Sequence, residues 1–515
     1  MTSIREKIAQ TEIVLVEKGK FNKEPVGGLF IGAQIITEAE DNIKYVREEV
    51  SRYREAANIM PLVASDFENG CGSMINGLTP MPYLMGLGAA NSEELAYSYG
   101  KATAVEGLSA GVNWSFSPVA DLNINPRNPL VNVRSVSDNP DIAVPILKNI
   151  VKGMQDNGMA ACAKHFPGDG VDWRDQHITT TCNSLDMDKW KQMSGHVFKE
   201  LIDAGVYSVM AGHITLPAYQ KSKFENGMNL PATLSYELVS NLLKEEMGFN
   251  GVVVSDALDM GGFLGWYSSK ERSEIECFKA GCDMLLWPTQ NYINNMIDAI
   301  ENGYISMKRV DDAVNRIMNM KEKLGLLKSN YAFQDISHGD KLFVRETQIK
   351  VAEKSVTLVK DTHGLLPFKK DKKILLIPIT HHTPAFDEAR RLKSEFEKRG
   401  STVLYYESGL PENELEKLVK EVDVVVYALF TRSFKPIGPI DFFAGEAVKV
   451  AYSLKSGVNK TVVISFGSPY FEGEYFERSS TYINAYSMLE PSVRACAKAL
   501  YGEIPFTGFS PVNIY

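Results

Sequence analysis

Asp175 and His177 stand two residues apart, where an apolar run gives way to a loop rich in Gly, Asp and His. In an extended loop this spacing places both side chains on one side of the chain. The carboxylate can then accept a hydrogen bond from one imidazole nitrogen and raise the basicity of the other. Such a histidine can protonate a leaving oxygen and later deprotonate water, so the pair is a candidate general acid/base. Taken alone, the spacing also fits a surface loop in which the two residues have no catalytic role.

A second reactive carboxylate is predicted at Asp256, which directly follows the apolar run at 251–255. A carboxylate at the mouth of a strand can attack an anomeric carbon and form a covalent intermediate. Asp259 is the weaker choice, because it falls where a turn or helix begins and an acidic residue is a natural cap there. Asp256 is therefore the candidate nucleophile, although a lone Ser-Asp pair after a strand also fits a simple cap.

Further polar side chains come at or just after the ends of other predicted strands. Lys164 and His165 are neighbours, so in an extended strand end they should point to opposite sides, and either could donate hydrogen bonds to sugar hydroxyls. Side chains from different strands converge only if the strands close around a common axis. The set comprises Asp66, Asp121, Lys164, His165, His213 and Asp256. Of these, we expect His213, like Lys164 and His165, to bind the substrate.

The first part of the chain alternates short apolar runs with longer amphipathic segments. Parallel strands need long crossovers, so this alternation predicts an α/β fold with a (β/α)8 TIM-type barrel, and a doubly wound sheet is the alternative. A helix over 307–326 closes the barrel. The predicted strands are 26–31, 59–64, 114–122, 159–163, 207–211, 251–255 and 283–286, and helices are expected at 142–157, 186–204 and 236–247.

A second pattern follows a polar, irregular stretch around 328–341. We predict a catalytic barrel at 1–330, a linker at 331–345 and a smaller α/β sandwich domain with a mainly parallel sheet at 346–515. Its predicted strands are 373–378, 402–406, 423–429 and 461–466, and its predicted helices are 387–399, 412–422, 444–456 and 491–501.

Composition narrows the class of protein. A net charge of −9 argues against a nucleic-acid partner. The first twenty residues contain no apolar signal-peptide core, and no stretch is long and apolar enough to span a membrane. The six cysteines form no CxxC pair, so neither a disulfide framework nor a zinc site is expected. We expect a cytoplasmic enzyme without metal or cofactor, and a homo-oligomer is possible.

The reactive segments resemble glycoside hydrolase family 3, and more narrowly its β-N-acetylglucosaminidase branch. Lys164-His-Phe-Pro-Gly168 resembles the family's substrate loop, Asp175-Gln-His177 the Asp-x-His pair of that branch, and Ser255-Asp256 the nucleophile motif. The resemblance implies that Asp66 holds sugar hydroxyls and that Arg134 contacts the substrate. It covers nearly the whole chain, and the motifs come in the family's order.

Two positions depart from the family pattern, Asp169 where histidine is common and Met74 where many members carry arginine. Members acting on plain glucosides or xylosides generally take their acid from the second domain, where Glu446, Glu472 and Glu474 are available here. The sequence thus predicts a retaining hydrolase that removes β-linked N-acetylhexosamine. The alternatives are a β-glucosidase or β-xylosidase, a phosphorylase, and a sugar-binding protein without activity.

Overall fold

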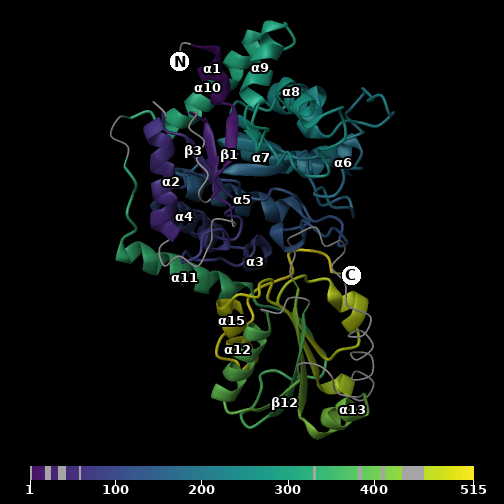
Figure 1. The fold of residues 1–515 in the computed structure, drawn as a ribbon. Coiled ribbons are helices and arrows are strands. Elements are labelled where there is room, and N and C mark those ends of the chain that lie inside the picture. The colour runs from purple at the N-terminus through teal and green to yellow at the C-terminus, as the bar shows by residue number, and fades with distance from the viewer. Residues whose placement is uncertain are drawn as a thin grey trace.

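The structure is a computed structural model that describes residues 3–17, 25–32, 42–56, 59–328, 332–380, 385–406, 412–431 and 457–514. Figure 1 shows two parts, one with strands β1 and β3 among many helices and one around strand β12, with helix α11 running between them. Each part contains a largely parallel sheet, so the predicted α/β class with a second α/β domain is confirmed.

Eight parallel strands of the first part are joined into a ring. One sheet has the order β10-β1-β2-β3-β4 and another the order β5-β7-β9. Parallel bridges connect them at Trp114–Ala160, Val119–Lys164 and Val254–Met284. A doubly wound sheet would leave two edge strands, and none of these eight is an edge. The strands are β1 (Glu12–Leu15), β2 (Gly28–Phe30), β3 (Leu62–Ser65), β4 (Trp114–Ser115), β5 (Cys162–Phe166), β7 (Ser208–Ala211), β9 (Val252–Ser255) and β10 (Leu285–Leu286).

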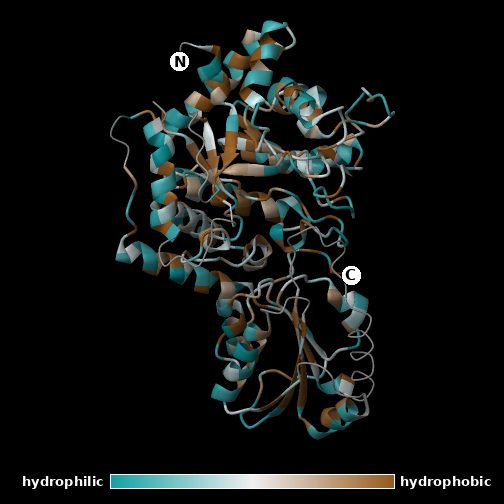
Figure 2. Ribbon diagram, in the orientation of Figure 1, coloured by the Kyte–Doolittle hydropathy of each residue, from teal (hydrophilic) through white to brown (hydrophobic). Residues whose placement is uncertain are grey.

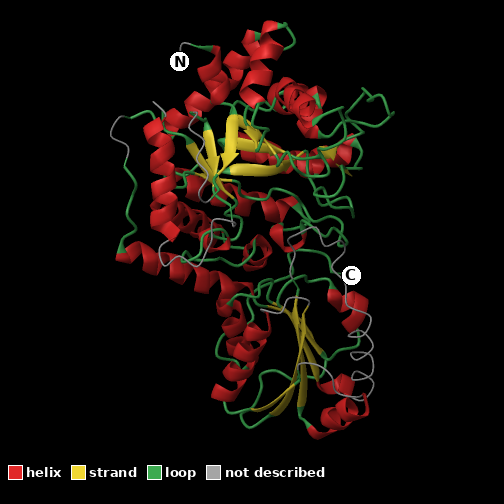
Figure 3. Ribbon diagram, viewed as in Figure 1, coloured by secondary structure: helices red, strands yellow, loops and turns green. Residues whose placement is uncertain are grey.

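Helices surround this ring, as the red ribbons around the yellow strands show in Figure 3. Most carry a serine, aspartate or asparagine cap, such as Ser92 before α4 and Asn139 before α5. A short parallel pair, β6 (Thr181–Cys182) and β8 (Ile214–Thr215), lies outside the ring. The helices are α1 (Ile4–Ala9), α2 (Asn42–Ala56), α3 (Leu84–Ala90), α4 (Glu93–Ser109), α5 (Pro140–Asp156), α6 (Met187–Gln192), α7 (Ser194–Asp203), α8 (Lys270–Ala280), α9 (Tyr292–Glu301) and α10 (Met307–Lys323), with a π-helical segment at Glu237–Glu246.

The strands divide their side chains between two apolar clusters. On β9, Val252 and Val254 belong to the cluster that also contains Met210 and Leu286, whereas Val253 belongs to the other. Successive strand side chains point to opposite faces, so this alternation is the pattern of a sheet buried on both sides. The same parity carries on to Asp256, which therefore points to the side of Val252 and Val254.

The second part is a sheet of order β11-β16-β15-β14-β12-β13, parallel except for the β11–β16 pair. Apolar clusters cover both faces, and its strands form the brown centre of the lower part in Figure 2. Its elements are α11 (His338–Ser355), β11 (Thr357–Asp361), β12 (Lys373–Thr380), α12 (Ala385–Lys398), β13 (Thr402–Tyr405), α13 (Glu412–Glu421), β14 (Val424–Phe430), β15 (Thr461–Ser465), β16 (Thr481–Asn484) and α15 (Glu490–Leu500).

Hydrogen bonds tie the second part to the loop that follows β4. The Asn123 side-chain amide donates to Tyr470 Oη at 2.6 Å, and that of Asn132 donates to Ser468 Oγ at 3.2 Å. Near the far end of the chain, Asn513 N donates to Asp138 Oδ2 at 2.7 Å. Met85, Val133, Tyr470, Tyr486, Val512 and their neighbours form an apolar cluster between the two parts.

Several predicted elements differ from those observed. The strand predicted at 114–122 is only two residues long, since Pro118 lacks the N–H that a ladder needs. The helix predicted at 186–204 is split at Met193 into α6 and α7. Strands β1, β6, β8, β11 and β16 were not predicted, and α11 begins within the stretch predicted as linker. The helix predicted at 444–456 lies outside the described residues.

Within the described ranges, no helix combines the length and the apolar character needed to cross a bilayer. The cytoplasmic location and the oligomeric state stay predictions.

Candidate active site

A cavity of about 370 Å³ opens at the carboxyl ends of the ring's strands. Polar side chains from β3, β5 and β9, or just after them, meet here with apolar ones from β4, β7 and β10. Parallel strands bring their carboxyl ends to one edge, which explains how residues far apart in sequence converge. The lining comprises Asp66, Glu68, Phe116, Arg134, Lys164, His165, Gln176, His177, Met210, Asp256, Ala257, Asp259, Met260, Leu286 and Trp287.

Asp256, the predicted nucleophile, is held by the backbone of its own strand region. Its N–H donates to Ala211 O at 2.9 Å, and its Oδ1 accepts from Ala257 N at 2.8 Å. Oδ2 is buried and has no hydrogen-bond partner among the described residues. Burial alone would raise the pKa of Asp256, but the nearby His165 and the Ala257 N–H hold it below its usual value. The carboxylate is thus charged and has one oxygen available for a reacting partner.

His165 lies between this carboxylate and a second one. Its Nδ1 is 2.7 Å from Asp121 Oδ2, and its Nε2 is 3.9 Å from Asp256 Oδ2. The latter distance is too long for a hydrogen bond, so the two groups interact through charge. Asp121 also accepts from the backbone N–H groups of His165 and Asp169. Asp121 therefore fixes the orientation in which His165 faces Asp256.

Lys164 and His165 both line the cavity, so the prediction that they point to opposite sides is wrong. The peptide bond between them is cis.

A buried network of charges forms another side of the cavity. Lys164 Nζ lies 2.8 Å from Asp66 Oδ1 and 2.5 Å from Glu68 Oε1. Arg134 donates from Nε and Nη2 to the two oxygens of Glu68, both at 2.7 Å. Burial opposes ionisation, but Arg134 and Lys164 hold the pKa of Glu68 well below its usual range. Paired charges of this kind present fixed donors and acceptors to a ligand rich in hydroxyl groups.

Asp175 and His177 form the hydrogen bond that their spacing predicts. Asp175 Oδ1 accepts from His177 N at 2.8 Å and lies 2.8 Å from His177 Nδ1. The Asp175 side chain is 2% exposed, whereas that of His177 is 33% exposed and lines the cavity. Burial opposes the charge of Asp175, but the hydrogen bonds from His177 lower its pKa below the usual value. The second ring nitrogen of His177 is thus left for the cavity.

The loop that carries this pair is attached to the loop that follows β9. Gly261 N donates to His177 O at 2.8 Å, and Gly262 N donates to Gln176 O at 3.1 Å. A Cβ at Gly261 would lie 2.3 Å from Ile178 O, so only glycine permits this approach. Thr180 Oγ1 adds a hydrogen bond to Gly262 O at 2.7 Å. The Asp175–His177 pair and Asp256 therefore lie on loops that support each other.

His213, predicted to bind substrate, is not among the residues lining the cavity. It is fully buried, with Nδ1 at 3.0 Å from Thr233 Oγ1 and Nε2 at 3.0 Å from Ala257 O. Burial lowers its pKa, so it is neutral and holds the backbone next to Asp256.

Glu68, Gln176 and Trp287 line the cavity but were not predicted as site residues. Glu68 carried a signal, because it follows Asp66 by two residues and side chains two apart share a side of an extended chain. No sequence pattern indicated that Gln176 and Trp287 line the cavity, since their position there depends on strands that are distant in sequence.

The two departures from the family pattern lie in different surroundings. Asp169 is buried behind Asp121, and burial and that neighbouring carboxylate raise its pKa to about 7. Met74 packs in the apolar cluster of the ring.

Of the second-domain glutamates, Glu472 is buried and pairs with Lys360 on β11, and Glu474 is exposed. Neither lines the cavity. Glu446 lies outside the described residues.

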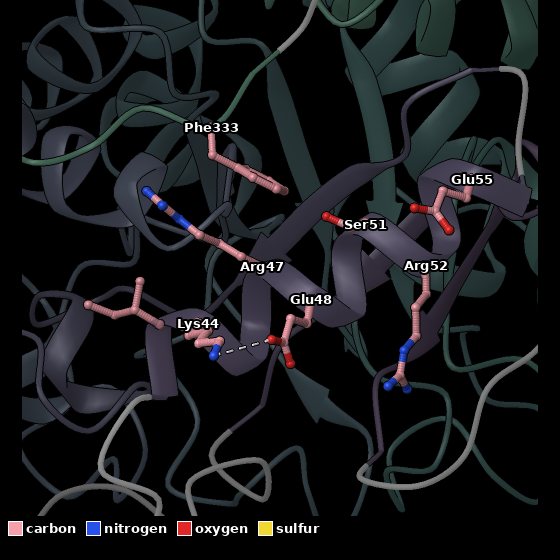
Figure 4. Close-up of a pocket in the computed structure, with 8 residues that line it drawn as sticks. Lys44, Arg47, Glu48, Ser51, Arg52, Glu55 and Phe333 are labelled. Carbon is pink, nitrogen blue, oxygen red and sulfur yellow. Dashed lines mark ion pairs between the residues drawn. The ribbon is translucent and has the colours of Figure 1, made fainter.

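A larger hollow, of about 630 Å³, lies over the outer face of α2 (Figure 4). Charged side chains of one helix line it, with a 3.9 Å pair between Lys44 and Glu48, and Phe333 lies at one side. It lies away from the carboxyl ends of the strands and contains no histidine. We interpret it as a solvated helix surface.

Comparison with known proteins agrees with this geometry. The glycosyl hydrolase family 3 N-terminal domain matches residues 3–320. The chain is 31% identical over 494 residues to a "Beta-N-acetylglucosaminidase/beta-glucosidase" of Cellulomonas fimi, covering 90% of this chain and 86% of that protein. A "Beta-hexosaminidase A" of Pseudoalteromonas piscicida is 26% identical over 541 residues, with 95% and 89% covered.

Solved structures match the whole chain. A "Beta-glucoside phosphorylase BglX" superposes with a TM-score of 0.88 at 29% identity, covering 100% of this chain and 94% of its own. A glycoside hydrolase family 3 β-N-acetylglucosaminidase from Paenibacillus sp. superposes with a TM-score of 0.83 at 25% identity, with 100% and 99% covered.

Proposed function

Since the chain belongs to glycosyl hydrolase family 3, we propose that it is a retaining glycosidase that removes terminal β-linked N-acetylglucosamine, or another N-acetylhexosamine, from oligosaccharides or cell-wall fragments. One observation carries the proposal. A charged, buried Asp256 with an available oxygen lines the same cavity as a carboxylate-supported His177.

In the first step Asp256 Oδ2 attacks the anomeric carbon, while His177 gives a proton to the leaving oxygen. A covalent glycosyl-aspartate forms, and the aglycone departs with the proton. In the second step His177 takes a proton from water, whose oxygen attacks the same carbon and releases Asp256. Two inversions retain the β configuration. Asp175 stabilises the imidazolium that is present before the first step and forms again in the second.

The remaining site residues bind and position the sugar. We assign the hydroxyl contacts to Asp66, Lys164 and His165, whose polar atoms line the cavity. Arg134 shapes the wall through its pair with Glu68. His213 does not contact the sugar. It positions the backbone next to Asp256 through its hydrogen bond to Ala257 O.

We propose a TIM-type barrel at 1–330, a linker at 331–345 and a second domain at 346–515 that supplies no acid/base. The ring of eight parallel strands supports the barrel. The pairing of Glu472 with Lys360 argues against a β-glucosidase or β-xylosidase that takes its acid from that residue.

Phosphorolysis is the second candidate function. A histidine base repels phosphate less than a carboxylate would, so phosphate could replace water in the second step. The similarity to a structure of a β-glucoside phosphorylase favours testing this acceptor.

The deciding experiment is product analysis on nitrophenyl glycosides of N-acetylglucosamine, glucose and xylose, with and without phosphate. We expect free N-acetylglucosamine as the main product, and a preference over glucose of at least about tenfold in kcat/KM, equivalent to roughly 1.4 kcal/mol. Sugar 1-phosphate as the main product would establish phosphorolysis. Absence of turnover on all three glycosides would favour a sugar-binding protein without activity.

A further inference from the structure

Gln176, between Asp175 and His177 in the chain, has a carboxamide whose orientation the backbone fixes. Its side chain is buried, with 1% of the residue exposed, and Oε1 accepts from His213 N at 3.0 Å. A backbone N–H can only donate, so the atom facing it must be the oxygen. The nitrogen Nε2 is therefore the other end of the group.

That nitrogen is buried and has no hydrogen-bond partner in the part of the chain that the structure describes. Gln176 also lines the cavity that holds Asp256 and His177. A buried donor left without an acceptor is unfavourable by about 1–3 kcal/mol. A ligand oxygen in the cavity would remove this penalty.

The side chain connects the two reacting groups. It starts on the loop of His177 and ends at His213, two residues beyond Ala211, whose carbonyl accepts from Asp256 N. Gln176 thus spans from the loop of His177 to the strand end that holds Asp256, beside the cavity in which the sugar carbon would be attacked. Two oxygen-bearing positions flank that carbon, the ring oxygen and the substituent on C2. The ring oxygen gains positive charge in the oxocarbenium-like transition state and becomes a poor acceptor, whereas hydrogen bonds to the C2 substituent strengthen there.

Resting on the proposed function, we propose that Gln176 is a substrate-binding residue whose Nε2 donates a hydrogen bond to the oxygen of the substituent on C2, which is the acetamido carbonyl in N-acetylglucosamine and the hydroxyl in glucose. Because the bond strengthens in the transition state, Gln176 contributes to kcat as well as to KM. Arg134, for which the family resemblance implies a substrate contact, already gives Nε and Nη2 to Glu68 and Nη1 to Leu130 O.

The test compares aryl glycosides of N-acetylglucosamine, glucose and 2-deoxyglucose. Gln176→Met keeps the length of the side chain and removes the donor. We expect kcat/KM to fall about 5- to 150-fold for the two substrates with an acceptor on C2, the range that 1–3 kcal/mol implies. For the 2-deoxyglucoside the loss should stay below about threefold.

Thr180→Val is the matched control, because it removes a hydrogen bond between the same two loops but Thr180 does not line the cavity. It should affect all three substrates by the same factor. Equal losses for all three with Gln176→Met would overturn the inference and leave Gln176 as a loop attachment.

Gln176→Glu is a second variant for the case that Gln176→Met does not fold. Its carboxylate keeps the acceptor for His213 N and lacks the donor. It should show the same selectivity among the three sugars, and a loss independent of the C2 substituent would contradict the inference. Failure of the wild type to cleave any aryl glycoside would instead refute the proposed function. Cleavage by the wild type with an unselective Gln176→Met refutes only the role of Gln176.

Discussion

Asp256 and His177 line one cavity, but the protein surrounds them differently. Asp256 is buried, takes a backbone N–H on one oxygen and faces His165, which lowers its pKa. His177 is one-third exposed and rests on one buried carboxylate, Asp175. A nucleophile must stay charged away from water, whereas an acid/base must exchange protons with water at every turnover. The difference in exposure therefore matches the difference in proposed roles.

The largest effect is expected from Asp256→Ala. Without the nucleophile no covalent intermediate forms, so kcat should fall at least about 10⁴-fold for good and poor leaving groups alike. Asp259→Ala, at an exposed position of the same cavity, is the control and should retain most activity. An activated fluorosugar should label Asp256 in the wild type, and mass spectrometry that located the label on Asp259 would reverse the assignment.

The effect of His177→Ala on the rate should depend on the leaving group, whereas that of Asp256→Ala should not. General acid catalysis is worth about 10²–10⁴-fold, and it matters least when the leaving oxygen needs no proton. We expect a loss in that range for alkyl or sugar aglycones and a much smaller loss of the first step for dinitrophenyl aglycones. Equal losses for both kinds would mean that His177 only positions the sugar.

Asp175→Asn should lower kcat/KM by about tenfold, less than His177→Ala, because it keeps the shape of the side chain and removes only the charge beside the imidazole. The expected loss is measured as kcat/KM on an N-acetylglucosaminide with a poor leaving group. A fully active Asn variant would contradict the proposal that Asp175 and His177 act as a catalytic pair.

The smallest effect concerns Asp169, on the buried side behind Asp121. Its pKa is raised from 3.8 to about 7, so the folded protein keeps a proton there that the unfolded chain has lost. The free energy of unfolding should therefore fall as pH rises from about 4 to about 7. Asp169→Asn has no ionisable group at this position and should not show this decrease. We expect the difference in Tm between variant and wild type to grow by about 2–4 °C between pH 5 and pH 8, measured by calorimetry. A constant difference would show that Asp169 does not titrate in this window.

The sequence predicted what depends on neighbouring residues. The parity of β9 follows from its run of valines and directs Asp256 to the cavity side, and the spacing of Asp175 and His177 predicts their hydrogen bond. Most strands of both sheets were located for the same reason.

What the sequence could not predict depends on partners far along the chain. Strand β1 is four residues long and is a strand because β10, some 270 residues later, pairs with it. The same holds for the burial of both nitrogens of His213 and for the carboxamide of Gln176, since Ala257 O and His213 N come from other strand ends.

The hydrogen bonds around residues 123–138 also bear on the order of events during synthesis. Ser137 and Asp138 bond to Pro511 and Asn513, which lie 374 and 375 residues downstream. A ribosome that has released the first 330 residues has exposed every predicted reactive group, yet Val133 still lacks its apolar cover from Tyr470 and Val512. The first part of the nascent chain therefore exposes an apolar patch beside the Arg134 loop until the later part has been translated and has packed against it.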